Sequence, residues 1–211
     1  MVRKTKGESQ ATYDALLDAA EREFVCKGVT RTTLNDVACS AGLTRGAIYW
    51  HFKDKSALLE AMCDRVFLPM QTLLNELAAS PGADPIAAIR QMMLHMLGQV
   101  AGNARQRTVF EIMFHHCEKD VQTPFLANEA QKRGECLAKL EVIVAEAVRQ
   151  EKLPADTDTG LAVQAINGYL IGLIYEWLID QQAYDLGLHA APLVDCFLAG
   201  LVALPPRRSA L

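Results

Sequence analysis

Apolar residues recur every three or four positions along most of the chain, the spacing that places them on one face of an α-helix. In the first long segment, Leu16, Ala20 and Phe24 share a face, and Gly28 follows, where glycine commonly ends a helix. No stretch alternates apolar and polar residues as a half-buried strand does. The pattern predicts an all-α protein with helices over residues 8–27, 34–40, 45–51, 54–79, 85–102, 104–118, 124–152, 158–180 and 192–204.

Two prolines bear on where these helices run. Pro69 falls inside the predicted 54–79 helix, where it should kink the helix or leave a carbonyl unpaired. The last helix is expected to begin at about Pro192 and to end before Pro205.

Two short predicted helices with a tight turn between them lie in the first quarter of the chain. Thr33 can cap the first of them, and Asp36, three residues later, completes a capping-box pattern. Gly42 gives the turn a residue that tolerates positive φ. Thr44 can cap the second helix, Arg45–His51. This layout is typical of a helix-turn-helix, whose second helix lies in the major groove of DNA.

The residues of that second helix suit contact with DNA. Its first turn carries the Thr44 hydroxyl and the Arg45 guanidinium, and arginine is the commonest specific reader of guanine. Gly46 permits close approach, and the aromatic and basic residues that follow can donate to phosphate oxygens. A helix pair with a glycine turn also occurs in unrelated folds, so the spacing by itself leaves an ordinary structural role open.

Four blocks of sequence carry a more specific resemblance. Residues Thr30–Ser56 resemble the DNA-binding signature of the TetR family of bacterial repressors, and Leu43–Lys55 is similar to the AcrR-type subgroup, which represses multidrug efflux pumps. The basic arm Arg3–Lys6, the block Phe114–Glu118 and the pattern over 168–178 also resemble that subgroup. With the resemblance, we expect DNA contacts from Arg3, Lys4, Lys6, Thr32, Thr33, Thr44, Arg45, Gly46, Tyr49, Trp50, His51 and Lys55.

The resemblance implies a nine-helix TetR-like fold. A three-helix DNA-binding domain would occupy residues 1–55, and a ligand-binding and dimerisation domain would occupy 56–211. It further implies a homodimer on a palindromic, double-stranded operator, released when a small hydrophobic effector binds.

Two further sets of residues follow from the resemblance. By position, the effector pocket should be lined by Phe67, Met70, Met92, Met96, Phe110, Phe114, Leu137, Ile171 and Tyr175. The dimer interface should include Leu170, Leu173, Trp177, Phe197 and Leu201. The plainer interpretation is ordinary core in both cases, since methionine and aromatic stripes at helical spacing usually pack inside a protein.

Charge and cysteine content add modest support. The 211 residues carry a net charge of −4, and the basic excess lies in the first 55 residues, which hold nine Lys or Arg and seven Asp or Glu. A basic head on an acidic body is compatible with a DNA reader. The six cysteines match no zinc spacing and are expected to be reduced thiols of a cytoplasmic protein.

Other functions are less favoured by the residues. Within the block His115–Glu118, only His115 and Glu118 have the spacing for two ligands of one metal ion, and no pair in the chain suggests a nucleophile with its base, so we expect no cofactor and no enzymatic activity. The apolar run 162–179 contains Gln164 and Glu176 and has no basic anchors, so we expect a buried helix and no membrane span. A binding protein that sequesters small molecules with a vestigial DNA head, and a redox-responsive regulator, are the alternatives.

Overall fold

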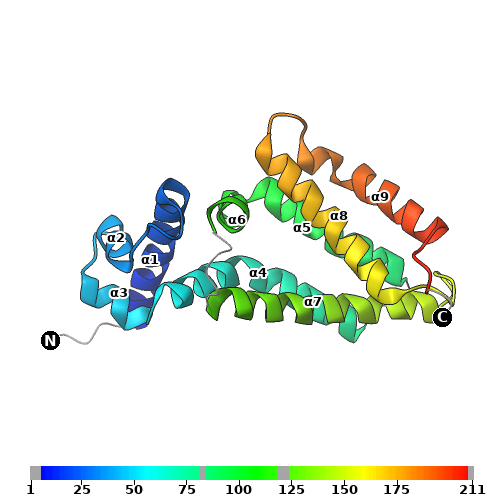
Figure 1. Cartoon of the computed structure of the whole chain (residues 1–211), viewed down its shortest axis with the longest axis horizontal. Helices are drawn as coiled ribbons and strands as arrows, with labels where there is room; N and C mark the ends of the chain where they lie inside the picture. The colour runs from blue at the N-terminus through cyan, green and yellow to red at the C-terminus, as the bar shows by residue number, and fades with distance from the viewer. Residues whose placement is uncertain (1–5, 81–83, 118–123, 209–211) are drawn as a thin grey trace. The chain divides into compact units, whose positions relative to one another are not determined.

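The computed structural model describes residues 6–80, 84–117 and 124–208. Over these residues the chain is helical, in agreement with the all-α prediction, and its one β-bridge pairs Thr157 with Arg207. Figure 1 shows the order of the helices, which are α1 Lys6–Lys27, α2 Leu34–Ser40, α3 Arg45–His51, α4 Lys55–Ala79, α5 Pro85–Gly102, α6 Ala104–Glu111, α7 Pro124–Arg149, α8 Thr159–Ile179 and α9 Leu186–Ala203. A π-helical segment, η1 Ile112–His116, continues directly from α6.

The main departure from the predicted boundaries concerns α9. It begins six residues before the predicted start at Pro192, which lies inside the helix. Asp185 caps the earlier start by accepting a hydrogen bond from the Leu188 amide at 2.9 Å. Buried Leu186 and Ala190 then anchor the first turns, so packing and a cap together outweigh the proline. The helix predicted over 104–118 likewise differs, because its last described turn is π-helical.

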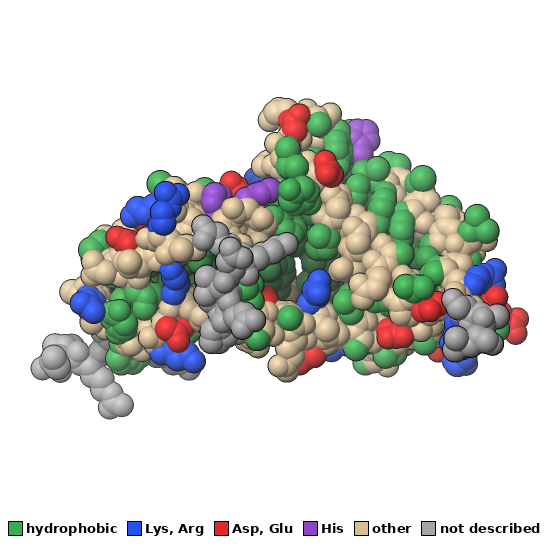
Figure 2. Space-filling model, in the orientation of Figure 1, with side chains coloured by type: hydrophobic (Ala, Val, Ile, Leu, Met, Phe, Trp, Pro, Cys, Tyr) green, Lys and Arg blue, Asp and Glu red, His purple; other side chains and the backbone are tan. Residues whose placement is uncertain are grey.

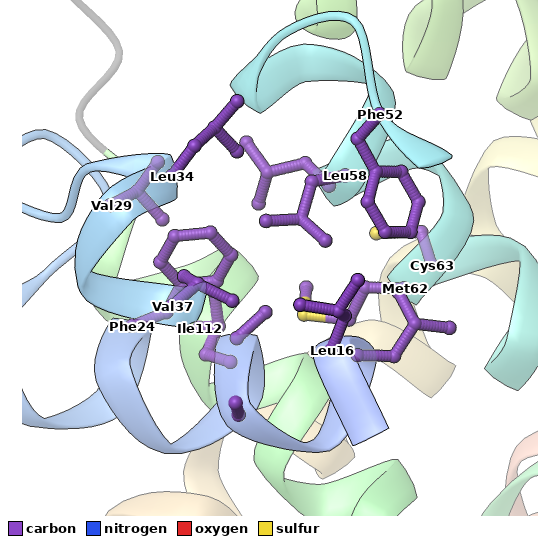
Figure 3. Packing of buried hydrophobic residues seen from close by; sticks show 14 of the residues in the cluster. Leu16, Phe24, Val29, Leu34, Val37, Phe52, Leu58, Met62, Cys63 and Ile112 are labelled. Atoms are coloured by element: carbon purple, nitrogen blue, oxygen red, sulfur yellow. The ribbon is translucent and has the colours of Figure 1, made fainter. Parts of the chain in front are cut away.

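The chain divides into two compact units, residues 1–67 with 105–130 and residues 68–104 with 131–211. The first unit extends past residue 55 because α4 and η1 contribute to its core. Figure 3 shows Leu58 and Met62 of α4 and Ile112 of η1 packed with Leu16 and Phe24 of α1. The unit boundary at Phe67 falls two residues before Pro69, which α4 accommodates inside its length. A functional division at residue 55 stays a prediction.

Ion pairs reinforce the first unit around α1. The Arg65 guanidinium of α4 donates to Asp18 at 2.8 Å and also to Glu21, which is buried. Arg105 of α6 contacts the same two carboxylates, at 2.7 Å and 3.4 Å. Because two arginines from different helices share two carboxylates of α1, the pairs fix the register of α4 and α6 against α1.

The second unit is built on α5, α8 and α9, which pack against one another. Tyr169 of α8 stacks on Phe197 of α9 at 4.4 Å and donates its hydroxyl to the Leu193 carbonyl. Arg90 of α5 pairs with Asp195 of α9, with Nη2 to Oδ2 at 3.0 Å.

Helices α8 and α9 are unusually apolar for the burial they receive. Their windows have mean hydropathies of 1.2 and 1.7, and only 33% and 28% of those windows is buried within the chain. Both are long and apolar enough to cross a membrane by length and composition, which is weak support for a span. A protein partner that covers the exposed apolar surface would satisfy the same composition.

Candidate nucleic-acid interface

The helix-turn-helix forms with the caps that the sequence predicts. The Thr33 hydroxyl accepts from the Asp36 amide at 3.1 Å, and the Asp36 carboxylate accepts from the Thr33 amide at 2.8 Å. Gly42 adopts a φ of 66° in the turn, a conformation that favours glycine. Thr44 caps α3 by accepting from the Ala47 amide at 3.2 Å. Two short helices are thereby held with little reliance on their own propensity.

Helix α3 has one buried anchor and an otherwise open surface. Ile48 is fully buried and ties the helix to the core, whereas Thr44, Arg45 and Gly46 at its start are exposed. Trp50 exposes 74% of its surface, which is uncommon for so large an apolar side chain. The exposed face therefore combines a guanidinium, a hydroxyl and an aromatic ring at the end that a DNA groove would receive.

Arg45 and Tyr49 form a pair on this face. The Arg45 guanidinium carbon lies 5.4 Å from the centre of the Tyr49 ring, within the range of a cation–π contact. Tyr49 is 47% exposed, so both side chains meet solvent. The stack orients the guanidinium and reduces the rotamer entropy that it would lose on contacting a base.

A hollow of about 570 Å³ beside α3 involves residues that the sequence reasoning missed. Ser9 and Thr12 of α1 line it with Thr44, Trp50 and other α3 residues. The Ser9 hydroxyl can donate to phosphate or sugar oxygens, as such groups commonly do in DNA complexes, whereas the Thr12 hydroxyl donates to the Glu8 carbonyl at 2.8 Å. No local pattern in the sequence signals these two residues, because only the packing of α1 on α3 brings them to the hollow.

Two of the predicted DNA contacts lie elsewhere. The Thr32 side chain is buried and donates to the Gly28 carbonyl at 2.8 Å. The Lys55 ammonium donates to the carbonyls of Val29, Thr30 and Thr32 at 2.7, 3.1 and 3.0 Å. Because these bonds use its three N–H donors, Lys55 is placed to hold the loop between α1 and α2, and a phosphate contact would require it to leave that loop.

The surroundings of Lys55 also affect its protonation. Burial lowers the pKa of the Lys55 ammonium, because the charged form loses hydration. The three carbonyl acceptors favour the charged form at close range.

Among the other predicted DNA contacts, His51 is half-buried beside Trp50 and Tyr13. Arg3 and Lys4 lie outside the described residues, as does the side chain of Lys6.

The predicted effector-lining residues fall in both compact units. In the first, Phe110 lies 5.3 Å from Phe67 and 5.6 Å from Phe114 between ring centres. In the second, Met70 and Met92 are buried, Met96, Leu137 and Ile171 are half-buried, and Tyr175 is exposed. Joint lining of one cavity by these residues stays a prediction.

The predicted dimer residues mostly pack inside a single chain. Leu170, Trp177 and Leu201 are buried, and the Trp177 indole donates to the Tyr184 carbonyl at 3.0 Å. They therefore offer little surface to a partner, and Leu173 and Phe197 are half-buried. The exposed apolar and glycine residues of α8 are a different set that shares one face, which exposed Gln164 and Glu176 flank: Leu161, Ala165, Gly168, Gly172, Tyr175 and Ile179.

The histidine and cysteine block after α6 shows no sign of a reactive site. Burial, and then the charge of Glu129, raises the pKa of the Cys117 thiol, although Lys55 opposes this. A raised pKa disfavours the thiolate that reacts with oxidants, and Cys63 is buried, so the structure does not favour redox sensing here. Within the described ranges no three His, Cys, Asp or Glu side chains gather as metal ligands, and Glu118 lies outside those ranges.

Comparisons with known proteins agree with this geometry. Residues 16–62 match the family described as bacterial regulatory proteins, tetR family, and residues 84–202 match the MAATS-type transcriptional repressor, C-terminal region. The chain is 36% identical to the HTH-type transcriptional regulator AcrR of Shigella flexneri, over 99% of this chain and 98% of that protein.

Solved structures give the same result. NalD, the secondary repressor of the MexAB-OprM multidrug efflux pump of Pseudomonas aeruginosa, superposes with a TM-score of 0.78 at 27% identity and covers 92% of this chain and 98% of its own. The SmeT–triclosan complex superposes with a TM-score of 0.79 at 29% identity, over 95% and 99%. SmeT is the repressor of the SmeDEF multidrug efflux pump of Stenotrophomonas maltophilia.

The first prediction concerns Lys55. Lys55→Met keeps the aliphatic stem and removes the ammonium group that donates to three loop carbonyls. The free energy of unfolding should therefore fall by about 1.5–3 kcal/mol. Urea unfolding followed by circular dichroism measures this, with exposed Lys53→Met as the matched control. Unchanged stability together with weaker DNA binding would instead make Lys55 a phosphate contact.

Proposed function

This chain belongs to the TetR family of bacterial transcriptional repressors, and we propose that it represses a multidrug efflux operon and leaves its operator when a small hydrophobic molecule binds. The observation that carries the proposal is the exposed face of α3, with Arg45 stacked on Tyr49 beside the open Trp50 ring. Its relatives include efflux-pump repressors that cover nearly the whole chain, so the same regulatory task is the simplest assignment. As a DNA regulator it would work in the cytoplasm.

DNA recognition in this proposal divides between two groups of side chains. Arg45, at the start of α3, would reach base edges in the major groove. Ser9 and Thr44 would donate to the DNA backbone in the adjacent hollow. Two copies in a symmetric dimer would place their α3 helices in grooves roughly 34–36 Å apart, or a multiple of that distance.

Members of this family form dimers, and we assign the interface to the exposed face of α8. Leu161 and Ile179 leave more than half of their surfaces open, at 55% and 61%. Between them, Gly168 and Gly172 occur one helical turn apart, and a Cβ added at either meets nothing within 4 Å in the chain. Backbones of two helices can approach closely at such positions. Exposed Leu188 and Val202 of α9 would extend the surface.

The effector site is proposed to be apolar and aromatic. The Phe67, Phe110 and Phe114 rings of the first unit supply aromatic surface, and the Phe110 ring centre lies 5.3 Å from that of Phe67 and 5.6 Å from that of Phe114. Aromatic compounds suit these rings best. In the second unit, the α5 face of Met92 and Met96 carries a buried His95 Nε2 atom that has no hydrogen-bond partner among the described residues, and a ligand hydroxyl or amide would satisfy it.

A protein that only sequesters small molecules is the second candidate. It would share the aromatic and methionine surfaces and would lack operator binding. The capped, exposed α3 argues for the repressor. A helix that no longer bound DNA would not be expected to keep a side chain as large and apolar as Trp50 exposed to solvent.

The second prediction tests recognition of DNA. Arg45→Ala should weaken binding to the DNA upstream of the chain's own gene by about 1–3 kcal/mol and relax the preference at one base position, because a base contact is lost. Fluorescence anisotropy with operator and scrambled duplexes measures both. Arg133→Ala, an exposed arginine of α7, serves as the control. Equal affinities of wild type and Arg45→Ala for the two duplexes would exclude a base contact at this residue.

The third prediction tests the interface. Gly172→Gln should fit the isolated chain, yet it should weaken dimerisation by about 1–3 kcal/mol and so raise the dissociation constant, since the added side chain would stand between the two helices. Gly98→Gln is the matched control, because Gly98 of α5 is exposed and equally open. Analytical ultracentrifugation of both variants decides the matter, and identical dissociation constants would place the interface elsewhere.

The fourth prediction tests the switch, with triclosan as the probe because SmeT has been solved with it. Triclosan should bind the wild-type chain and lower its operator affinity by roughly 1–3 kcal/mol at saturation. Phe114→Ala should weaken triclosan binding by about tenfold while operator binding without ligand is kept.

Calorimetry measures triclosan binding, and anisotropy measures operator affinity in the same samples. Val142→Ala, on the exposed side of α7, should behave as wild type in both measurements. Binding of triclosan with unchanged operator affinity would favour the sequestering protein. Operator binding with no triclosan binding would contradict the proposed effector class.

A further inference from the structure

Two arginines that share two carboxylates stand where the chain passes between its compact units. The chain leaves the first unit after Phe67 and returns to it at Arg105. Arg65 lies two residues before the first of these crossings, and Arg105 is the first residue after the second. Both arginines contact Asp18 and Glu21 of α1, so one group of charges connects two crossings to the helix on which α2 and α3 pack.

Each carboxylate divides one oxygen between the two arginines. Asp18 Oδ1 lies 2.8 Å from Arg65 Nη1 and 2.7 Å from Arg105 Nη2. Glu21 Oε1 accepts from Arg65 Nη2 and lies 3.4 Å from Arg105 Nε. Arg65 is thus held through its two Nη atoms, and its Nε atom is buried without a hydrogen-bond partner among the described residues.

The two halves of this charge cluster differ in exposure. The side chains of Glu21 and Arg65 are only 10% and 18% exposed, whereas those of Asp18 and Arg105 are 42% and 43% exposed. Figure 2 shows acidic and basic side chains close together at several places on the visible face of the first unit. Exposed pairs of that kind contribute little to stability, because water and salt screen them. The Arg105 half of the cluster is therefore weakly held, and the Arg65 half is held firmly.

A second arrangement of the same charges is available. If Arg105 withdraws, the Glu21 carboxylate can turn to the Nε side of Arg65 and form the two parallel bonds that arginine favours with a carboxylate. A buried donor then gains a partner, and an exposed ion pair is lost. These two effects oppose each other and each is small, so the arrangements lie close in free energy. Coupling between distant sites requires an element with two such states.

We propose that Arg105 is a positioning residue through which the effector acts on the DNA-binding helices. With Arg105 on Asp18 and Glu21, α6 is tied to α1, against which α3 packs. An effector that displaces α6 removes Arg105 from the carboxylates, Arg65 takes Glu21 side-on, and α1 loses one of its two supports. The inference rests on the effector response proposed above and identifies the residue that transmits it.

Arg105→Gln tests this coupling, because it keeps the size of the side chain and removes its charge. The variant should adopt the second arrangement without ligand, so its operator affinity should fall about two- to fivefold, the range that an exposed ion pair supports. Because coupling is reciprocal, its triclosan affinity should rise in parallel, whereas a merely structural role would weaken both affinities. Arg105→Lys, which can restore one contact with Asp18, should recover most of the wild-type values.

Three measurements follow the variants. Fluorescence anisotropy gives the operator affinity without ligand, and calorimetry gives the triclosan affinity. The NMR signal of the Arg65 Nε–H group reports the arrangement directly: in Arg105→Gln it should shift downfield, and its proton should exchange with water more slowly, because the donor gains a partner. Arg133→Gln, an exposed arginine of α7, removes one positive charge outside the cluster and should behave as wild type throughout.

The outcomes separate this inference from the proposed function. A wild-type chain that does not respond to triclosan would contradict the effector proposal, while the operator affinity without ligand and the Arg65 signal would still decide the role of Arg105. Unchanged operator affinity and an unchanged Arg65 signal in Arg105→Gln would overturn the inference. Parallel losses of operator and triclosan affinity would also overturn it, because Arg105 would then only support the fold.

Discussion

The ammonium group of Lys55 secures the part of the molecule on which the rest depends. It stands at the first turn of α4 and donates hydrogen bonds to three carbonyls of the loop between α1 and α2. The Val29 and Thr32 carbonyls, whose bonds to Lys55 are part-buried, would otherwise lack this partner, at a cost of about 1–3 kcal/mol each. With the loop fixed, Thr33 is positioned to cap α2, and the helix-turn-helix follows from local hydrogen bonds.

The same loop is where other contacts of the first unit converge. The buried Thr32 hydroxyl donates to the Gly28 carbonyl across this loop, and the Val29 amide donates to the His116 carbonyl of η1. The Arg65 and Arg105 pairs with α1 hold α4 and α6 in register with this arrangement. A change at η1 therefore reaches the helix-turn-helix through hydrogen bonds and ion pairs within one compact unit.

Composition and burial together define the other surfaces. Helices α8 and α9 are apolar enough to be mistaken for membrane spans, yet an open face with Gly168 and Gly172 is better explained by a second copy of the chain. The unpaired His95 nitrogen among methionines is a comparable case, since a buried polar atom without a partner suggests a ligand that supplies one. In the first case apolar residues are exposed to solvent, and in the second a polar atom is buried; each is unfavourable within one chain and suggests a binding partner.

The sequence by itself determined the helical class, the caps at Thr33 and Thr44, and the exposed reading face of α3, because these depend on residues within one or two helical turns. It did not determine that Lys55 and Thr32 turn inward or that Ser9 and Thr12 border α3, since these contacts join residues far apart in the chain. Nor could it separate buried Leu170 and Trp177 from exposed Leu161 and Ile179, because apolar residues occur on every side of α8 and their periodicity carries little information. Only the packing of α5 and α9 against α8 decided which of its faces remained open.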